Sequence, residues 1–128
     1  MTRVMVVDDD PLLRRALACA LARCGYDVSI AHDGERALRI AQITAPSVAI
    51  VDLHMPGGGL ALVRELKRLG GDAIHVAVLS GEDADVIAEA CGEAGADEVL
   101  SKPITPAELR RRVAAAIASL AAEPASAA

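Results

Sequence analysis

The chain has 128 residues, of which 53% are hydrophobic, and it carries a formal net charge of −5. These values indicate one domain with a core of its own and exclude a disordered chain. The acidic balance argues against direct nucleic-acid binding, and no uncharged apolar run approaches the roughly 18 residues of a membrane-spanning helix. We therefore expect a cytoplasmic protein that binds neither nucleic acid nor membrane directly.

Short apolar runs alternate with helical stretches along the chain. Runs without polar alternation are typical of strands buried on both faces of a parallel sheet, and in chain order they are Val4–Val7, Val28–Ala31, Val48–Val51, Val76–Leu79 and Val99–Leu100. Between them, apolar residues recur at spacings of three and four, which predicts helices. These stretches are Leu13–Cys24, Ala37–Ala41, Leu62–Leu69, Val86–Ala94 and Leu109–Leu120.

Capping residues at the borders of these segments agree with this assignment. Asp10-Pro11 and Thr105-Pro106 each combine an N-cap residue with a proline at the first helical position. Successive strand–helix units predict an α/β fold: a doubly wound, five-stranded parallel sheet in the flavodoxin-like order 2-1-3-4-5, with helices on both faces. We expect the domain to span residues 1–121, and residues 122–128 to form a flexible tail or the start of a linker.

Polar residues follow four of the predicted strands at the point where each strand ends. Ligands of open α/β sheets bind at the carboxyl ends of the strands, so we expect these side chains to converge, except that Asp10 caps a helix. Carboxylates suit Mg²⁺, a lysine and a hydroxyl suit a phosphoryl group, and a central carboxylate can act as a nucleophile. The residues are Asp8, Asp9 and Asp10 after the first strand, Asp52 after the third, Ser80 after the fourth and Lys102 after the fifth.

Four motifs in this order resemble the receiver domains of two-component response regulators. The resemblance extends over roughly residues 3–120, nearly the whole chain, and each motif alone would be a weak signal. The motifs are VVDDDP at residues 6–11, DLHMP at 52–56, LSG at 79–81 and SKP at 101–103.

The resemblance implies a role for each site residue. Asp52 would accept the phosphoryl group, Ser80 would bond one of its oxygens and Lys102 would pair with it. Asp9 would bind Mg²⁺ directly and Asp8 mainly through water, while His54 would offer its backbone carbonyl to the metal. The Lys102-Pro103 peptide would be cis.

The resemblance also implies partners and a mode of action. The phosphoryl donor would be a sensor histidine kinase or a histidine phosphotransfer protein. The chain would promote only its own phosphorylation and dephosphorylation and would not turn over a substrate. Phosphorylation would switch a face formed by the fourth helix, the fifth strand and the fifth helix, which would bind an unknown downstream effector. A homodimer through the same face remains open.

Two departures from the family pattern bear on this hypothesis. Val99 stands where receiver domains often carry an aromatic residue that moves together with the Ser80 position. The loop Pro56-Gly57-Gly58-Gly59 is one residue shorter than usual, and its glycines predict flexibility. His54 and Glu82 occupy positions that tune the lifetime of the phosphoryl group in the family.

Two alternative functions remain at this point. A pseudo-receiver would keep the fold as an interaction module without phosphorylation, and the departures at Val99 and in the glycine loop allow it. A phosphatase of the haloacid-dehalogenase type also uses an aspartate nucleophile, which Asp8 and Asp10 could mimic as a DxD pattern. That enzyme would have no use for Asp52 after the third strand, and the chain leaves no room for a cap domain.

Overall fold

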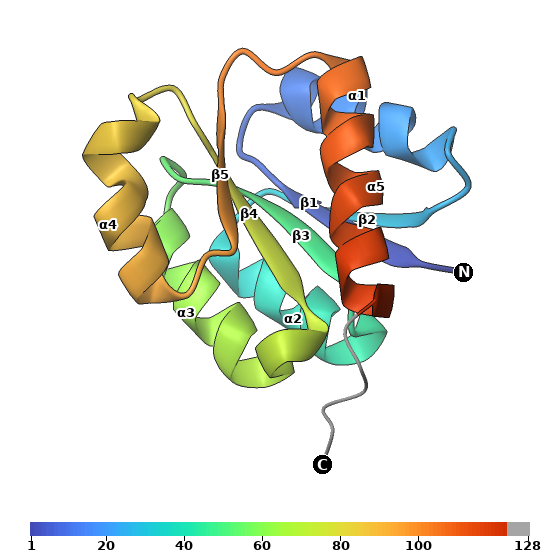
Figure 1. Ribbon diagram of the computed structural model, residues 1–128, viewed down its shortest axis with the longest axis horizontal. Coiled ribbons are helices and arrows are strands. Elements are labelled where there is room, and N and C mark those ends of the chain that lie inside the picture. The colour runs from blue at the N-terminus through green and yellow to red at the C-terminus, as the bar shows by residue number, and fades with distance from the viewer. Residues whose placement is uncertain (123–128) are drawn as a thin grey trace.

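A five-stranded parallel sheet forms the centre of the molecule in the computed structural model, which describes residues 1–122 (Figure 1). The strands are β1 (Arg3–Val7), β2 (Asp27–Ala31), β3 (Val48–Asp52), β4 (His75–Ser80) and β5 (Glu98–Ser101). Their order is β2-β1-β3-β4-β5 and all neighbours are parallel, which confirms the predicted topology. Within residues 1–122, none of the helices has the length and apolarity to cross a membrane.

Helices cover both faces of this sheet. They are α1 (Pro11–Ala22), α2 (Gly34–Thr44), α3 (Gly59–Gly70), α4 (Ala84–Ala94) and α5 (Pro106–Ala122), with a short 3-10 helix, η1, at Gly71–Ala73. Helices α2, α3 and α4 pack on one face, and α1 and α5 pack on the other (Figure 1). Helix α5 reaches Ala122, and the rest of the predicted tail, 123–128, lies outside the described residues.

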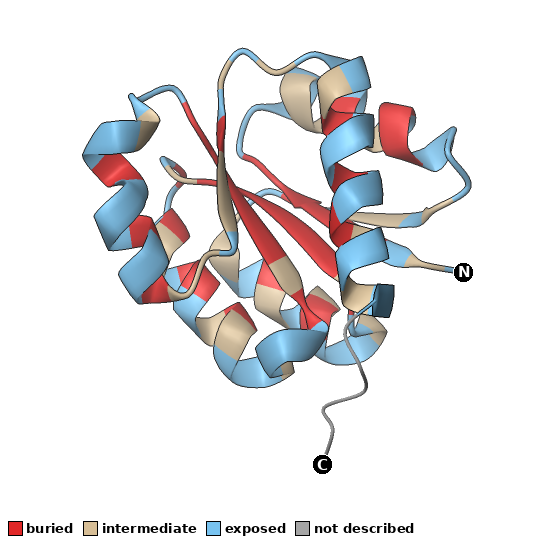
Figure 2. Cartoon of the chain, in the orientation of Figure 1, coloured by how far each residue is buried: buried red, intermediate tan, exposed pale blue. Residues whose placement is uncertain are grey.

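The core consists of two apolar layers, one on each side of the sheet. Alternate residues of a strand enter opposite layers, because successive side chains point to opposite faces. In β1, for example, Met5 and Val7 pack toward α2 and α3, whereas Val4 and Val6 pack toward α1 and α5. Figure 2 shows the result, with the central strands buried and each helix buried only along its inner side. The continuous apolar runs of the sequence therefore reflect a sheet that is covered by helices on both faces.

Asp10 and Thr105 cap α1 and α5 as predicted, and both helices begin near the carboxyl ends of the strands. The Asp10 carboxylate accepts hydrogen bonds from the backbone N–H groups of Leu12, at 3.0 Å, and Leu13, at 3.3 Å. The Thr105 hydroxyl accepts one from the N–H of Glu108 at 3.1 Å. Each bond satisfies a helix donor that has no partner within the helix, so α1 and α5 begin at fixed points.

The three glycines of the β3–α3 loop have specific conformational roles. Gly57 and Gly58 have φ values of +92° and +82°, a region that favours glycine. A Cβ at Gly59 would lie 2.6 Å from the carbonyl oxygens of both Asp52 and Leu53. The short loop thus brings the start of α3 directly against the end of β3, and only glycine allows that approach.

We predict that Gly59→Ala destabilises the protein by about 1–3 kcal/mol, because its methyl group overlaps backbone oxygens that cannot move freely. The matched control is Gly92→Ala in α4, where a Cβ meets nothing within 4 Å. That substitution should stabilise by about 0.4–1 kcal/mol, because alanine favours the helix. Chemical denaturation measures both, and equal stabilities of the two variants would contradict this account of the loop.

Candidate functional site

The predicted site residues lie together at one edge of the sheet, where four parallel strands end. Asp8 follows β1, Asp52 and Ser80 are the last residues of β3 and β4, and Lys102 follows β5. The backbone N–H of Lys102 donates to the carbonyl of Ser80 at 2.7 Å, which fixes the end of β5 beside the end of β4. The Lys102-Pro103 peptide is cis. Strand order thus brings together residues that are far apart in the chain.

Three carboxylates and one ammonium group form the centre of this site. Asp8, Asp9 and Asp52 each offer a carboxylate oxygen within 4.8 Å of the others. The Lys102 Nζ lies 3.2 Å from Oδ1 of Asp52 and 3.7 Å from Oδ2 of Asp8. Asp8 and Asp52 are only 1% and 3% exposed, whereas Asp9 is exposed. The single lysine therefore faces more negative charge than it can neutralise.

Asp8 experiences this imbalance most strongly. Burial raises the pKa of its carboxyl group, and the charges of Asp52 and Asp9 raise it further. The N–H of Asp10, which donates to Oδ1 of Asp8 at 2.9 Å, and the ammonium of Lys102 lower the pKa and oppose this shift. Oδ2 of Asp8 is buried without a hydrogen-bond partner among the described residues. A buried carboxylate oxygen without a partner is costly.

This donor set fits a hard divalent cation. All three candidate ligands are carboxylates, one of them has a buried oxygen without a hydrogen bond, and the group has an excess of negative charge. A small cation with oxygen ligands would remove the excess charge and give Oδ2 of Asp8 a favourable neighbour. The predicted acidic cluster is therefore a site that could bind a metal.

The loops after β3 and β4 meet across the opening of the site. Nε2 of His54 lies 2.9 Å from Oε1 of Glu82, so a contact between these side chains connects the two loops. Below it, the N–H of His54 donates to Oδ1 of Asp52 at 3.2 Å, and the N–H of Glu82 donates to the Ser80 hydroxyl at 3.0 Å. The sequence marks both positions as close to the site but does not predict their contact, which depends on the loop conformations.

Arg14 is a further residue near the site that the sequence analysis did not identify. It lies in the first turns of α1 and is half-buried, and its Nη1 donates to the backbone carbonyl of Asp8 at 2.9 Å. The only signal in the sequence is its spacing of six residues from Asp8, which is not specific.

Comparisons with known proteins agree with the predicted family and with the observed fold. A family model described as the response regulator receiver domain matches residues 4–114. Response regulator MprA of Mycobacterium ulcerans (strain Agy99) is 38% identical over 114 residues, which cover 88% of this chain and 49% of the relative. Probable transcriptional regulator ycf27 of Cyanophora paradoxa is 37% identical over 112 residues, covering 87% of this chain and 46% of the relative. The chain thus spans about half the length of these curated relatives.

Solved structures show the same architecture. The BeF3-activated DrrB receiver domain superposes with a TM-score of 0.83 at 27% identity, covering 92% of this chain and 98% of that one. A CheY-like response regulator receiver domain protein from Methanospirillum hungatei JF-1 gives a TM-score of 0.90, covering 97% of this chain and 99% of that one. At 22% identity, the second similarity shows a shared fold alone. From the matched family model, the similar relatives and the shared fold, we conclude that the chain belongs to the response regulator receiver domain family.

Proposed function

We propose that this chain is a phosphorylation switch whose acceptor is Asp52 and whose reaction requires Mg²⁺. The observation that carries the proposal is the position of Asp52: a buried carboxylate, 3.2 Å from the Lys102 ammonium and within 4.8 Å of the acids Asp8 and Asp9. The phosphoryl donor would be a phosphohistidine on a sensor histidine kinase or a histidine phosphotransfer protein. The proposal includes a cytoplasmic location and a receiver unit that spans residues 1–121.

The proposed reaction is a phosphoryl transfer between two side chains. Oδ1 of Asp52 accepts hydrogen bonds from Lys102 and from the N–H of His54, which leaves Oδ2 as the oxygen that attacks phosphorus. The new bond joins this oxygen to phosphorus, the phosphorus–nitrogen bond of the donor breaks, and its electron pair returns to the imidazole. Bound Mg²⁺ would offset the charge of the three acids and of the phosphoryl oxygens.

Lys102 and Ser80 are proposed to hold the transferred group. Lys102 already contacts the acceptor and, being partly exposed, can move its charge toward a new phosphoryl oxygen. The Ser80 hydroxyl accepts a hydrogen bond from the N–H of Glu82, so its own proton is free to be donated. In the same scheme, the backbone carbonyl of His54 would bind the metal, while its imidazole contacts Glu82.

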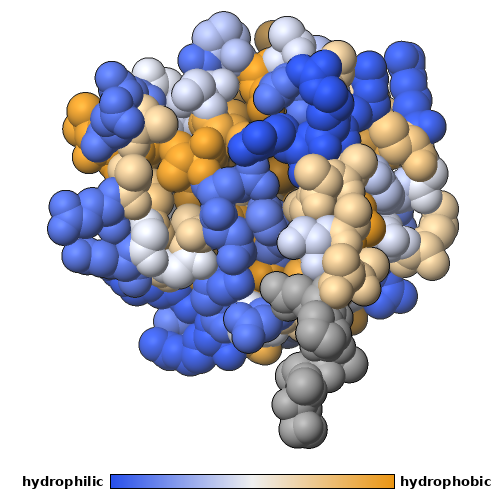
Figure 3. Space-filling view, viewed as in Figure 1, coloured by the Kyte–Doolittle hydropathy of each residue, from blue (hydrophilic) through white to orange (hydrophobic). Residues whose placement is uncertain are grey.

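The proposed output surface is formed by α4, β5 and α5. Apolar surface is exposed between α4 and β5 (Figure 3), and Val86 of α4 is 74% exposed. Helix α5 is fixed to β5 because Arg112 donates to Glu98 at 2.9 Å, and Glu98 in turn contacts His75 of β4. Val99 packs half-buried against the layer that contains α4. We propose that phosphorylation acts on this surface through the Ser80–Glu82 loop, since Val99 cannot act as an aromatic switch.

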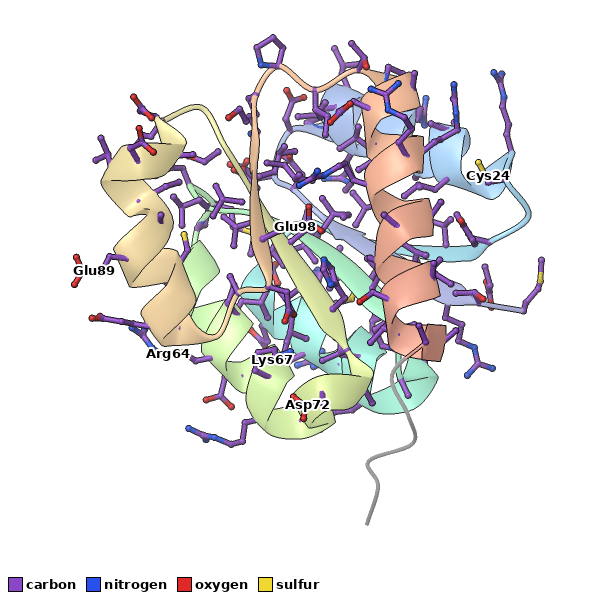
Figure 4. The ribbon with its side chains drawn as sticks, in the orientation of Figure 1. Cys24, Arg64, Lys67, Asp72, Glu89 and Glu98 are labelled. Atoms are coloured by element: carbon purple, nitrogen blue, oxygen red, sulfur yellow. The ribbon has the colours of Figure 1, made fainter. Side chains whose placement is uncertain are left out.

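Charge on this surface suits one kind of partner in particular, a second copy of the chain. Helix α4 carries acids at i, i+4 and i+8, namely Asp85, Glu89 and Glu93, none of which forms an ion pair among the described residues. Figure 4 shows Glu89 directed away from the protein. Helix α5 carries Arg110 and Arg111, of which Arg111 already forms an ion pair with Glu108 of the same helix. A twofold dimer would place the acids of one copy against the arginines of the other, and a downstream effector is the other candidate partner.

The first prediction from this proposal concerns the acceptor. Incubation with acetyl phosphate and Mg²⁺ should add one phosphoryl group to the wild-type protein and none to Asp52→Asn, as read by intact mass. The control is Asp72→Asn, an exposed acid of η1 far from the site, which should be modified like the wild type. An unmodified wild-type protein with its fold intact would favour the pseudo-receiver.

The second prediction concerns Asp8 and stability. Without Mg²⁺ at neutral pH, Asp8→Asn should raise the free energy of unfolding by about 1–3 kcal/mol, because it removes a buried charge whose Oδ2 has no hydrogen bond among the described residues. Mg²⁺ should then stabilise the variant less than the wild type, since the variant has lost one of the three negative charges that would attract the cation. Thermal unfolding with and without Mg²⁺ measures both effects, with Asp72→Asn as the control.

The pH dependence of the metal-free protein follows from the direction of the Asp8 shift. The pKa of Asp8 is higher in the folded state than its usual 3.8, so the folded state binds this proton more readily than the unfolded chain. The contribution of Asp8 to stability is therefore unfavourable at neutral pH and becomes less so as pH falls through its folded pKa. In Asp8→Asn this relief should be absent, so the stability of the variant relative to the wild type should be greatest at neutral pH. If the difference in free energy of unfolding between Asp8→Asn and the wild type is the same at neutral and acidic pH, the raised pKa of Asp8 is contradicted.

A further inference from the structure

Asp9 differs from the other two acids of the site in how it is held. Asp8 and Asp52 are buried, and each accepts a hydrogen bond from a backbone N–H group. The Asp9 side chain is exposed, and within residues 1–122 it has neither a hydrogen bond nor an ion pair, although one of its oxygens lies within 4.8 Å of oxygens of both other acids. The backbone of the β1–α1 loop must therefore direct this carboxylate.

Arg14 binds both neighbours of Asp9. Its guanidinium donates to the carbonyl of Asp8 at 2.9 Å, and its backbone N–H donates to the carbonyl of Asp10, also at 2.9 Å. The second bond is an ordinary helical bond and survives any substitution except proline. The first bond depends on the arginine side chain and connects the first turns of α1 back to the end of β1.

Arg14 contacts the site through a hydrogen bond to a backbone carbonyl. Among the described residues, the ion pairs of Asp8 and Asp52 are made with Lys102 and not with Arg14. Its contribution to the site is therefore to fix the peptide that joins Asp8 to Asp9.

We propose that Arg14 is a positioning residue for the cation site: by holding the Asp8 carbonyl, it directs the Asp9 carboxylate toward Asp8 and Asp52. This inference rests on the proposed Mg²⁺ site and adds a residue to it. Loss of the guanidinium would remove none of the three carboxylates. It would allow the Asp8–Asp9 peptide to rotate, so that the Asp9 carboxylate would no longer be held toward Asp8 and Asp52. Mg²⁺ would then have to order this peptide when it binds, which lowers its affinity.

The test compares Arg14→Met with Arg15→Met. Both variants remove one positive charge from the same helix, but Arg15 is exposed and forms no hydrogen bond or ion pair in the described part of the chain. The readout is a Mg²⁺ titration followed by the backbone amide signals in NMR, with the Tm of each metal-free variant measured alongside. We expect the Kd for Mg²⁺ to rise about three- to tenfold in Arg14→Met, the equivalent of one hydrogen bond, and to change by less than about twofold in Arg15→Met.

Two further measurements separate positioning from a general structural effect. In an Asp9→Asn background, Arg14→Met should not weaken Mg²⁺ binding further, because the carboxylate that it positions is gone. In the metal-free protein, the Asp9 amide should become more mobile in Arg14→Met and remain unchanged in Arg15→Met, which tests the same idea without any metal.

The outcomes for the two proposals differ. A wild-type protein that binds no Mg²⁺ overturns the proposed function and this inference with it. A wild-type protein that binds Mg²⁺, with equal Kd values for Arg14→Met and Arg15→Met, overturns only the role of Arg14. The role of Arg14 is also overturned if Arg14→Met weakens Mg²⁺ binding by the same factor in the Asp9→Asn background. The effect of Arg14 would then not depend on the Asp9 carboxylate.

Discussion

Two carboxylates are almost completely removed from water at the ends of β1 and β3, and one ammonium group faces them. At an effective dielectric constant near 20, two like charges about 4 Å apart repel by roughly 4 kcal/mol. Lys102 offsets part of this repulsion, but three carboxylates face this one ammonium group, and Oδ2 of Asp8 has no hydrogen bond among the described residues. The protein tolerates the remaining cost because the surrounding sheet and loops hold these groups in place. Because of this repulsion, a cation bound between the carboxylates would change the local energy balance strongly.

Sheet topology determines which charged residues lie close enough to repel or attract one another at this site. The chain runs from β1 to β2 on one side and then returns to β3 on the other, so strand order reverses between β1 and β3. Ligands in open α/β sheets bind outside the carboxyl ends of the strands at this point of reversal. Asp8 and Asp52 flank it, and Lys102 reaches it from β5. The loops position the neighbouring helices. Gly59 allows the start of α3 to lie against the end of β3, and Arg14 of α1 donates a hydrogen bond to the Asp8 carbonyl after β1.

Periodicity and strand-end polarity were enough to predict a parallel sheet with helices on both faces and the helix starts at Pro11 and Pro106. The clustering of the acids with Lys102 followed once the flavodoxin-like strand order was assumed. These features depend on local patterns and on general rules of parallel sheets. Contacts between loops did not follow from such patterns. The His54–Glu82 pair depends on the relative conformations of two loops, and the bond from Arg14 to the Asp8 carbonyl involves a backbone group that leaves no mark on the sequence. The glycines at 57–59 were interpreted as a source of flexibility, whereas the structure gives them steric roles.

Helix α4 has an intrinsic weakness with consequences for how the protein moves. Its unpaired acids, Asp85, Glu89 and Glu93, repeat at i+4 along one stripe, and Gly92 lies exposed inside the last turns. Together these features cost an isolated helix roughly 1–2 kcal/mol. In native-state hydrogen exchange, the amides of α4 would therefore open at lower free energy than those of the central strands, ahead of global unfolding. The helix that follows the Ser80 loop is thus a segment that the chain can remodel at small cost while the sheet stays intact.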